Sequence, residues 1–394
     1  MAQAVALYEQ LQSELDDEQQ DFYTYEKKLD EIMTAFGHDL LEAGMGKLPA
    51  DARKKKMIDT RFGTVVIRAT HRYSAAINGY RISPYLQERL VFAGQSEVYS
   101  QGTDLIKLFL GVEMNAMQVH RVTNTYGALS VGLVGASESE VMKKVVKADE
   151  VVYVQTDGSM VLTREEAWQE VKVGRIFCQS EVLKLSSTRK EVQQSLYVAH
   201  LGSHTDFLKK FEPMVDVFDD LGARLVFITD GASWIRKWQQ ESYPNALQIL
   251  DFTHGVEHIA KWLEYAEKDK SKRTQIFNVY KTLLYQKGVS AVIARIAATP
   301  STLKTVLEER RKLLNYLNTN AYRMDYPKYI AQGLSIGSGA IEAAHRTIIQ
   351  KRMKQSGQRW SQQRVQHMLN IKTANASGQW CKIVNLIRYP KVAA

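Results

Sequence analysis

Two aspartates each follow an apolar run and precede a glycine, a pattern that can bring a carboxylate to a place where chemistry occurs. Asp157 stands in VVYVQTDG (151–158), and Asp230 stands in RLVFITDG (224–231). Runs rich in β-branched and aromatic residues are typical of buried strands, and Asp-Gly is a turn dipeptide. We therefore predict that each strand stops at its Asp-Gly and places the carboxylate at the rim of a sheet. One such pattern usually marks only a turn, but two in one region indicate a site.

A third acid, Glu342, lies in a predicted helix over 340–355 whose other charged residues are basic. An acid in a first helical turn can simply interact with the helix dipole. With Asp157 and Asp230, however, it completes a set of carboxylates that suits the hard cations Mg²⁺ or Mn²⁺. Two such ions activate a water or 3′-hydroxyl and stabilise the leaving oxygen in a displacement at phosphorus. The sequence has no P-loop, dinucleotide fingerprint or nucleophilic triad, so no nucleotide cofactor is expected.

The elements that must position these acids follow from the hydrophobic pattern. We predict strands over 151–158, 168–180, 193–200, 224–229 and 246–250, helices over 204–221 and 233–241, a charged helical block over 254–330 and the last helix over 340–355. The order β-β-β-α-β-α-β, helical block, α predicts an α/β fold, specifically an RNase H-like core with an all-helical insertion. In such a sheet the first three strands are antiparallel, and the first and fourth are parallel neighbours.

The residues before this core are predicted to be mainly helical. We expect one or two helices over 3–45, a basic loop to Lys56, a hairpin over 58–73, and a helix over 84–94. Two further helices over 100–127, joined at Gly111, resemble a helix-turn-helix, although helix–Gly–helix is commonplace. In that motif the exposed side chains that face DNA would be Gln118, His120, Arg121 and Asn124.

The formal net charge of +9 over 394 residues favours an anionic partner, most obviously nucleic acid. Basic residues crowd the stretch after Glu342 and would hold DNA phosphates: Arg346, Lys351, Arg352, Lys354, Arg359 and Arg364. Trp360, among them, would stack on an unpaired base or pack in the core. We divide the chain into an N-terminal helical region (1–48), a DNA-binding region (49–145), the first part of the core (146–260), the insertion (261–332), and the last core helix with a basic C-terminal region (333–394).

The remaining composition is that of an ordinary globular protein. The two cysteines, Cys178 and Cys381, lie far apart and form neither a zinc pattern nor a disulfide framework, which favours a reducing compartment. No signal peptide or membrane span is found, so we expect a cytoplasmic protein.

Four ordered motifs closely resemble those of bacterial insertion-sequence transposases of the DDE class, on the branch related to Mutator-like elements. They are QTDGSM with WQEVKVGRIF, FITDGASWI, LDFTHGVEHI and GSGAIEAAHRTIIQKRMKQSGQRWS, within about residues 150–370. The resemblance implies an RNase H-like core, divalent metal, and Asp157, Asp230 and Glu342 as the catalytic triad. The family's C/D-x-x-H signature corresponds to Asp251 and His254, which would lie near the active site or merely cap a helix. The cysteine-rich zinc element of many relatives is absent here.

The leading hypothesis is a transposase that binds the inverted-repeat ends of its element, cuts a strand and joins the end to target DNA, as a dimer or larger assembly on double-stranded DNA. One alternative is an RNase H-fold nuclease or resolvase that cleaves without joining. Another is a DNA-binding protein derived from a transposase that no longer cuts. The sequence alone does not separate strand hydrolysis from strand joining.

Overall fold

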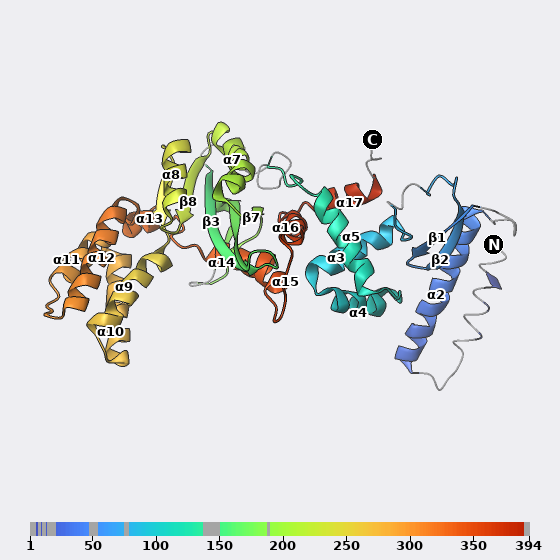
Figure 1. Ribbon diagram of the computed structural model, residues 1–394, viewed down its shortest axis with the longest axis horizontal. Helices are drawn as coiled ribbons and strands as arrows, with labels where there is room; N and C mark the ends of the chain where they lie inside the picture. Colours follow the sequence, from blue (N-terminus) through green and yellow to red (C-terminus); the bar gives the residue numbers. More distant parts are fainter. Residues whose placement is uncertain are drawn as a thin grey trace. The chain divides into compact units, whose positions relative to one another are not determined.

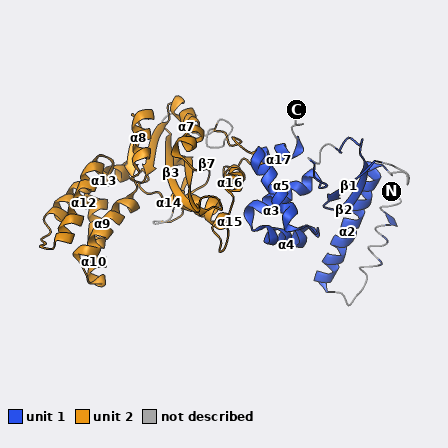
Figure 2. Cartoon of the chain, viewed as in Figure 1, with its two compact units in different colours: residues 1–129, 381–394 blue, residues 130–380 orange. Residues whose placement is uncertain are grey.

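A computed structural model describes residues 21–46, 54–74, 79–136, 150–186 and 190–389, together with residues 5, 6, 9 and 13. The chain divides into two compact units, one of residues 1–129 with 381–394 and one of residues 130–380 (Figure 2). Most of the first predicted helix before residue 21, the basic loop up to residue 53, and the predicted domain borders at 48 and 145 lie outside the described residues.

Unit 2 is built on a mixed sheet of five described strands in the order β7-β4-β3-β8-β9 (Figure 1). The strands are β3 (Val151–Leu162), β4 (Trp168–Cys178), β7 (Leu196–Leu201), β8 (Arg224–Thr229) and β9 (Leu247–Leu250). β3, β4 and β7 pair antiparallel, whereas β8 pairs parallel with both β3 and β9. The predicted mixed α/β architecture is therefore confirmed, including the parallel contact between the first and fourth predicted strands.

Alternate residues of β3 face two different helical layers, because side chains alternate across a strand. Val152 and Val154 belong to a core shared with α7 (His204–Asp220) and α8 (Ser233–Ser242). Tyr153 belongs to a second core on the opposite face, shared with the helical block. That block comprises α9 (Phe252–Ala266), α10 (Lys270–Lys287), α11 (Val289–Ala297), α12 (Lys304–Asn320), the short 3₁₀ turn η2 (Ala321–Arg323) and α13 (Tyr326–Ala331).

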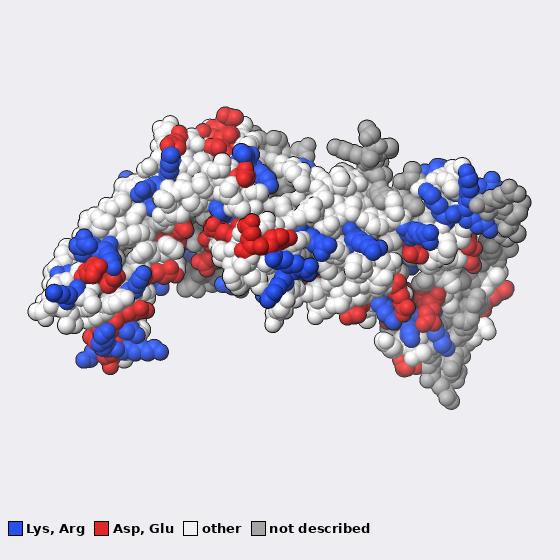
Figure 3. All heavy atoms as spheres, viewed as in Figure 1, with Lys and Arg blue, Asp and Glu red and all other residues white. Residues whose placement is uncertain are grey.

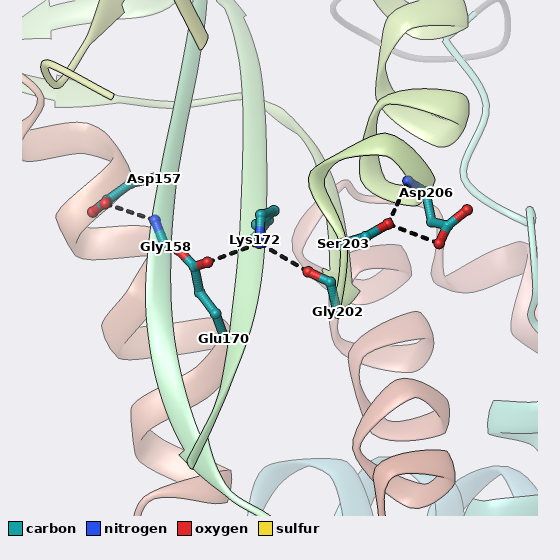
Figure 4. Close-up of polar contacts among 7 residues, drawn as sticks. All are labelled: Asp157, Gly158, Glu170, Lys172, Gly202, Ser203 and Asp206. Atoms are coloured by element: carbon teal, nitrogen blue, oxygen red, sulfur yellow. Dashed lines mark hydrogen bonds and ion pairs between the residues drawn. The ribbon is translucent and has the colours of Figure 1, made fainter. Parts of the chain in front are cut away.

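The prediction that the first strand ends at Asp157-Gly158 was wrong. The parallel pairing of β3 with β8 ends at Thr156 opposite Thr229, but the antiparallel pairing with β4 continues to Leu162 opposite Trp168. Gly158 serves close packing rather than a turn, because a Cβ there would lie 2.0 Å from Oε1 of Glu170. Figure 4 shows this carboxylate beside Gly158, where it also accepts a hydrogen bond from Lys172.

The segment between the second and third predicted strands contains a small hairpin that the sequence did not predict. After the turn η1 (Gln179–Glu181), β5 (Val182–Lys184) pairs antiparallel with β6 (Lys190–Val192). The third sheet strand therefore starts at Leu196, three residues later than expected.

The last predicted helix changes its winding part of the way along. It begins as α14 (Gly339–Ala344), continues as a π-helical segment η3 (His345–Gln350) and ends as α15 (Lys351–Met353). The chain then forms α16 (Gln362–Ala376), which packs on β7.

Unit 1 contains the helices and the hairpin expected near the N-terminus. They are α2 (Phe22–Met45), β1 (Lys55–Thr60), β2 (Gly63–Arg68), α3 (Pro84–Ser96), α4 (Tyr99–Leu110) and α5 (Ala116–Leu129). The unit also includes the C-terminal helix α17 (Trp380–Arg388), of which Trp380 falls in unit 2. β1 and β2 pair antiparallel, starting three residues earlier than predicted. Gly111 ends α4 in a left-handed conformation, which explains the glycine between the two helices.

Both cysteines are free, Cys178 buried and Cys381 exposed. In the described parts of the chain, no helix combines the length and the apolar character needed to cross a bilayer.

Candidate active site

The three predicted carboxylates line one cavity of about 220 Å³ in unit 2. Asp157 is the first residue of β3 beyond its parallel pairing with β8, and Asp230 is the first residue after β8, so both stand at the same edge of the sheet. Glu342 reaches the cavity from α14, the helix that follows the whole helical block. Segments far apart in the sequence thus bring three acids to one hollow.

Asp157 is the acid whose environment opposes its charge most clearly. Burial raises its pKa to about 6, and the negative charges of Asp230 and Glu342 act in the same direction. A hydrogen bond from the backbone N–H of Gly158 to Oδ1, at 2.7 Å, partly offsets this rise. A carboxylate that is destabilised by neighbouring carboxylates is a typical feature of a functional site.

Asp230 is held by the turn that follows β8. Its Oδ1 accepts a hydrogen bond from the backbone N–H of Ala232 at 3.0 Å. Beside it, a Cβ on Gly231 would lie 3.4 Å from the hydroxyl oxygen of Tyr316, which comes from α12 of the helical block. That hydroxyl is shielded from solvent and has no hydrogen-bond partner among the described residues.

Asp251, which the resemblance places near the active site, lines the cavity and links two segments. Its side chain caps α9 by accepting the backbone N–H of His254 at 2.7 Å, and its other oxygen accepts the backbone N–H of Ser338. Ser338 directly precedes α14, so Asp251 fastens the end of β9 to the start of the helix that carries Glu342. His254 also lines the cavity, with its ring 3.6 Å from the Glu257 carboxylate.

His345 is a residue at this site that the sequence reasoning missed. It lies three positions after Glu342, and its Nε2 is 3.4 Å from Oδ2 of Asp157. Residues three apart share one side of a helix, so the spacing Glu342-x-x-His345 was a usable signal. It was overlooked because a lone histidine among basic residues suggests no partner until the fold brings β3 beside it.

Most of the predicted phosphate-binding residues are exposed in unit 2, namely Arg346, Lys351, Lys354, Arg359 and Arg364. Basic side chains gather over α15 next to a group of acidic side chains in Figure 3. Arg352 is a correction, because it is only 1% exposed, whereas Trp360, at 8% exposed, follows the core-packing alternative. The guanidinium of Arg352 lies 4.9 Å from the centre of the Trp360 ring, so both side chains serve packing rather than DNA contact as they lie.

The helix-turn-helix-like pair lies in unit 1 and exposes fewer side chains than predicted. Of the four residues expected to face DNA, Arg121 is exposed, whereas Gln118, His120 and Asn124 are half-buried. Gln118 and Asn115 cap the start of α5 by exchanging hydrogen bonds between side chain and backbone. His120 packs edge-on against Tyr99 from α4.

The cavity has the donor type of a divalent-cation site but not yet the geometry. Carboxylate oxygens are the ligands that Mg²⁺ and Mn²⁺ prefer. Within the described ranges, however, no three His, Cys, Asp or Glu side chains lie close enough to hold one ion as they stand. Metal binding would therefore require the carboxylates to move closer to one another.

Comparison of the chain with protein-family models and with curated protein sequences gives no match. The family resemblance therefore rests on the motifs themselves.

Proposed function

We propose that this protein is a DDE-class DNA transposase with an RNase H-like core. It would bind the ends of its element, cut a DNA strand there in a divalent-metal-dependent reaction, and join the end to target DNA. The observation that carries the proposal is the cavity shared by Asp157, Asp230 and Glu342. The strand order β7-β4-β3-β8-β9 supports the RNase H-like assignment, as does the helical block between Asp230 and Glu342.

The cofactor of the proposal is Mg²⁺ or Mn²⁺, two ions held by Asp157, Asp230 and Glu342. When bound, such ions supply Lewis-acid activation of the attacking oxygen and stabilisation of the leaving oxygen. The electrostatics of the site support cation binding, because a positive charge would relieve the repulsion that Asp157 feels from Asp230 and Glu342.

The chain's own residues have separate tasks in this proposal. Asp157 and Asp230 would present oxygens from two neighbouring strands, β3 and the end of β8, and Asp251 would hold the helix that presents Glu342. Exposed Arg346, Lys351 and Lys354, which follow Glu342 in the chain, would neutralise DNA phosphates next to the cavity. Arg121 in unit 1 is the remaining candidate for contact with the element ends.

The test is a strand-transfer assay with DNA that carries the segments flanking the coding sequence as candidate ends. The purified protein is incubated with labelled ends and a supercoiled target plasmid, in Mg²⁺, in Mn²⁺ and in EDTA, and the products are separated on a denaturing gel. Asp230→Asn removes one proposed ligand charge. Asp220→Asn, at the exposed end of α7, is the matched control.

We expect metal-dependent nicked and joined products from the wild type and the control, and none from Asp230→Asn. Cleavage without joining would replace the proposal with a nuclease or resolvase. Specific binding of the ends without cleavage in either metal would indicate a DNA-binding derivative. Full activity of Asp230→Asn would refute the carboxylate assignment.

A further inference from the structure

His345 has a buried imidazole directed at one of the three carboxylates. The residue is 4% exposed, and its Nε2 lies 3.4 Å from Oδ2 of Asp157. This nitrogen is shielded from solvent, and the contact is not aligned as a hydrogen bond, so Nε2 has no such partner among the described residues. A buried ring nitrogen without a hydrogen bond is costly, and a small rotation of either side chain would supply one.

The local winding of the helix supports a specific role for this position. Helix α14 ends at Ala344, and the π-helical segment η3 begins at His345. A π-helical turn is wider than an α-helical one, costs stability, and is found frequently at functional sites. Here the change of winding begins at the residue whose ring meets Asp157.

An imidazole carries an N–H on Nε2 in its protonated form and in one of its two neutral tautomers, so Nε2 of His345 can be the donor. The other oxygen of Asp157, Oδ1, already accepts the backbone N–H of Gly158.

We propose that His345 is a positioning residue, whose ring donates its Nε2–H to Oδ2 of Asp157 and fixes the direction in which this carboxylate meets a divalent cation. With one donor on each oxygen, the remaining lone pairs of Asp157 are turned toward the cavity. Removing a hydrogen-bond donor that orients a metal-binding side chain in this way typically lowers metal affinity by about 10–100-fold. The inference rests on the proposed metal-dependent function.

The experiment compares two substitutions at this position. His345→Gln keeps an N–H donor close to the place of Nε2, whereas His345→Phe keeps a flat ring and removes the donor. His204→Gln, at an exposed position at the start of α7, is the control. Mn²⁺ binding is measured without DNA by isothermal titration calorimetry, and the Mn²⁺ concentration for half-maximal strand cleavage is measured separately. Thermal melting in EDTA reports whether each variant is folded.

We expect His345→Phe to weaken Mn²⁺ binding by about 10-fold or more, and His345→Gln and His204→Gln to stay within a few-fold of the wild type. Wild-type affinity in the Phe variant would overturn the proposal, as would equal losses in folded Gln and Phe variants or the absence of Mn²⁺ binding by the wild type. If the Phe variant does not fold, His345→Leu takes its place, and if that too is unfolded the residue is structural and the proposal falls. Mn²⁺ binding that follows the expected order without any DNA cleavage would refute the proposed function and support the role of His345.

Discussion

Replacing Asp157 by Asn should make the metal-free protein more stable at neutral pH. The pKa of Asp157 rises from 3.8 to about 6 on folding, through burial and the charges of Asp230 and Glu342. Below about pH 4 the carboxyl is protonated in both the folded and the unfolded state and contributes nothing. Between about pH 4 and 6 the folded state alone keeps the proton, so the wild type loses stability as the pH rises. Above about pH 6 the penalty is complete.

The size of the effect follows from the same shift. A rise from 3.8 to about 6 corresponds to about 3 kcal/mol, at about 1.4 kcal/mol for each pKa unit. The side chain is 36% exposed, so water screens part of this, and we expect about 1–2 kcal/mol. Asn keeps an oxygen that can accept the N–H of Gly158, so the substitution removes the charge and little else.

The assay is urea unfolding in EDTA at a series of pH values, with Asp220→Asn as the control for loss of an exposed acid. Adding Mg²⁺ then supplies the second half of the test. Binding to the folded state stabilises the wild type by about 1.4 kcal/mol for each tenfold excess over its dissociation constant, and Asp157→Asn should lose most of this gain.

Two results would refute the reasoning. One is an Asp157→Asn protein no more stable than the wild type at about pH 8 in EDTA, since the site would then carry no electrostatic penalty. The other is a stability difference between the two proteins that does not shrink as the pH falls from about 6 to 4, since the cause would then not be ionisation of Asp157.

Three further outcomes follow from the packing. Gly158→Ala should destabilise unit 2 by about 1–3 kcal/mol, because the new methyl group would displace the Glu170 carboxylate from the buried Lys172. The loss, measured by urea unfolding, should shrink in a Glu170→Ala background. Asp251→Ala should lower the free energy of unfolding by about 2–4 kcal/mol, because it leaves the backbone N–H groups of His254 and Ser338 without an acceptor. Amide hydrogen exchange at the start of α14 should accelerate, and unchanged exchange there would contradict the link between Asp251 and this helix. Tyr316→Phe should leave stability unchanged or raise it by up to about 1 kcal/mol, because the hydroxyl is shielded from solvent and lacks a hydrogen-bond partner among the described residues. A clear fall in the thermal melting temperature would show that the hydroxyl makes a stabilising hydrogen bond.

The sequence by itself determined most of the order of elements in unit 2. Arg224–Thr229 was predicted with its observed bounds, because a short apolar run between polar turns allows little else. The antiparallel first three strands and the parallel fourth were also predicted, and so was the meeting of Asp157, Asp230 and Glu342 in one place. An acid directly after a buried parallel strand, as Asp230 is, can only stand at the sheet edge, and for that acid the information is local.

Contacts between distant segments decided the rest. β3 continues past Gly158 because Trp168–Cys178 returns beside it, which the turn dipeptide alone could not reveal. Arg352 looked like one of several surface cations until the fold laid it against Trp360. Asp251 meets Ser338, and His345 meets Asp157, only when the helical block brings α14 back to the sheet. The sequence gives the charge and shape of each side chain. Its partner depends on which segment packs beside it, and the packing of segments depends on the burial of the whole core.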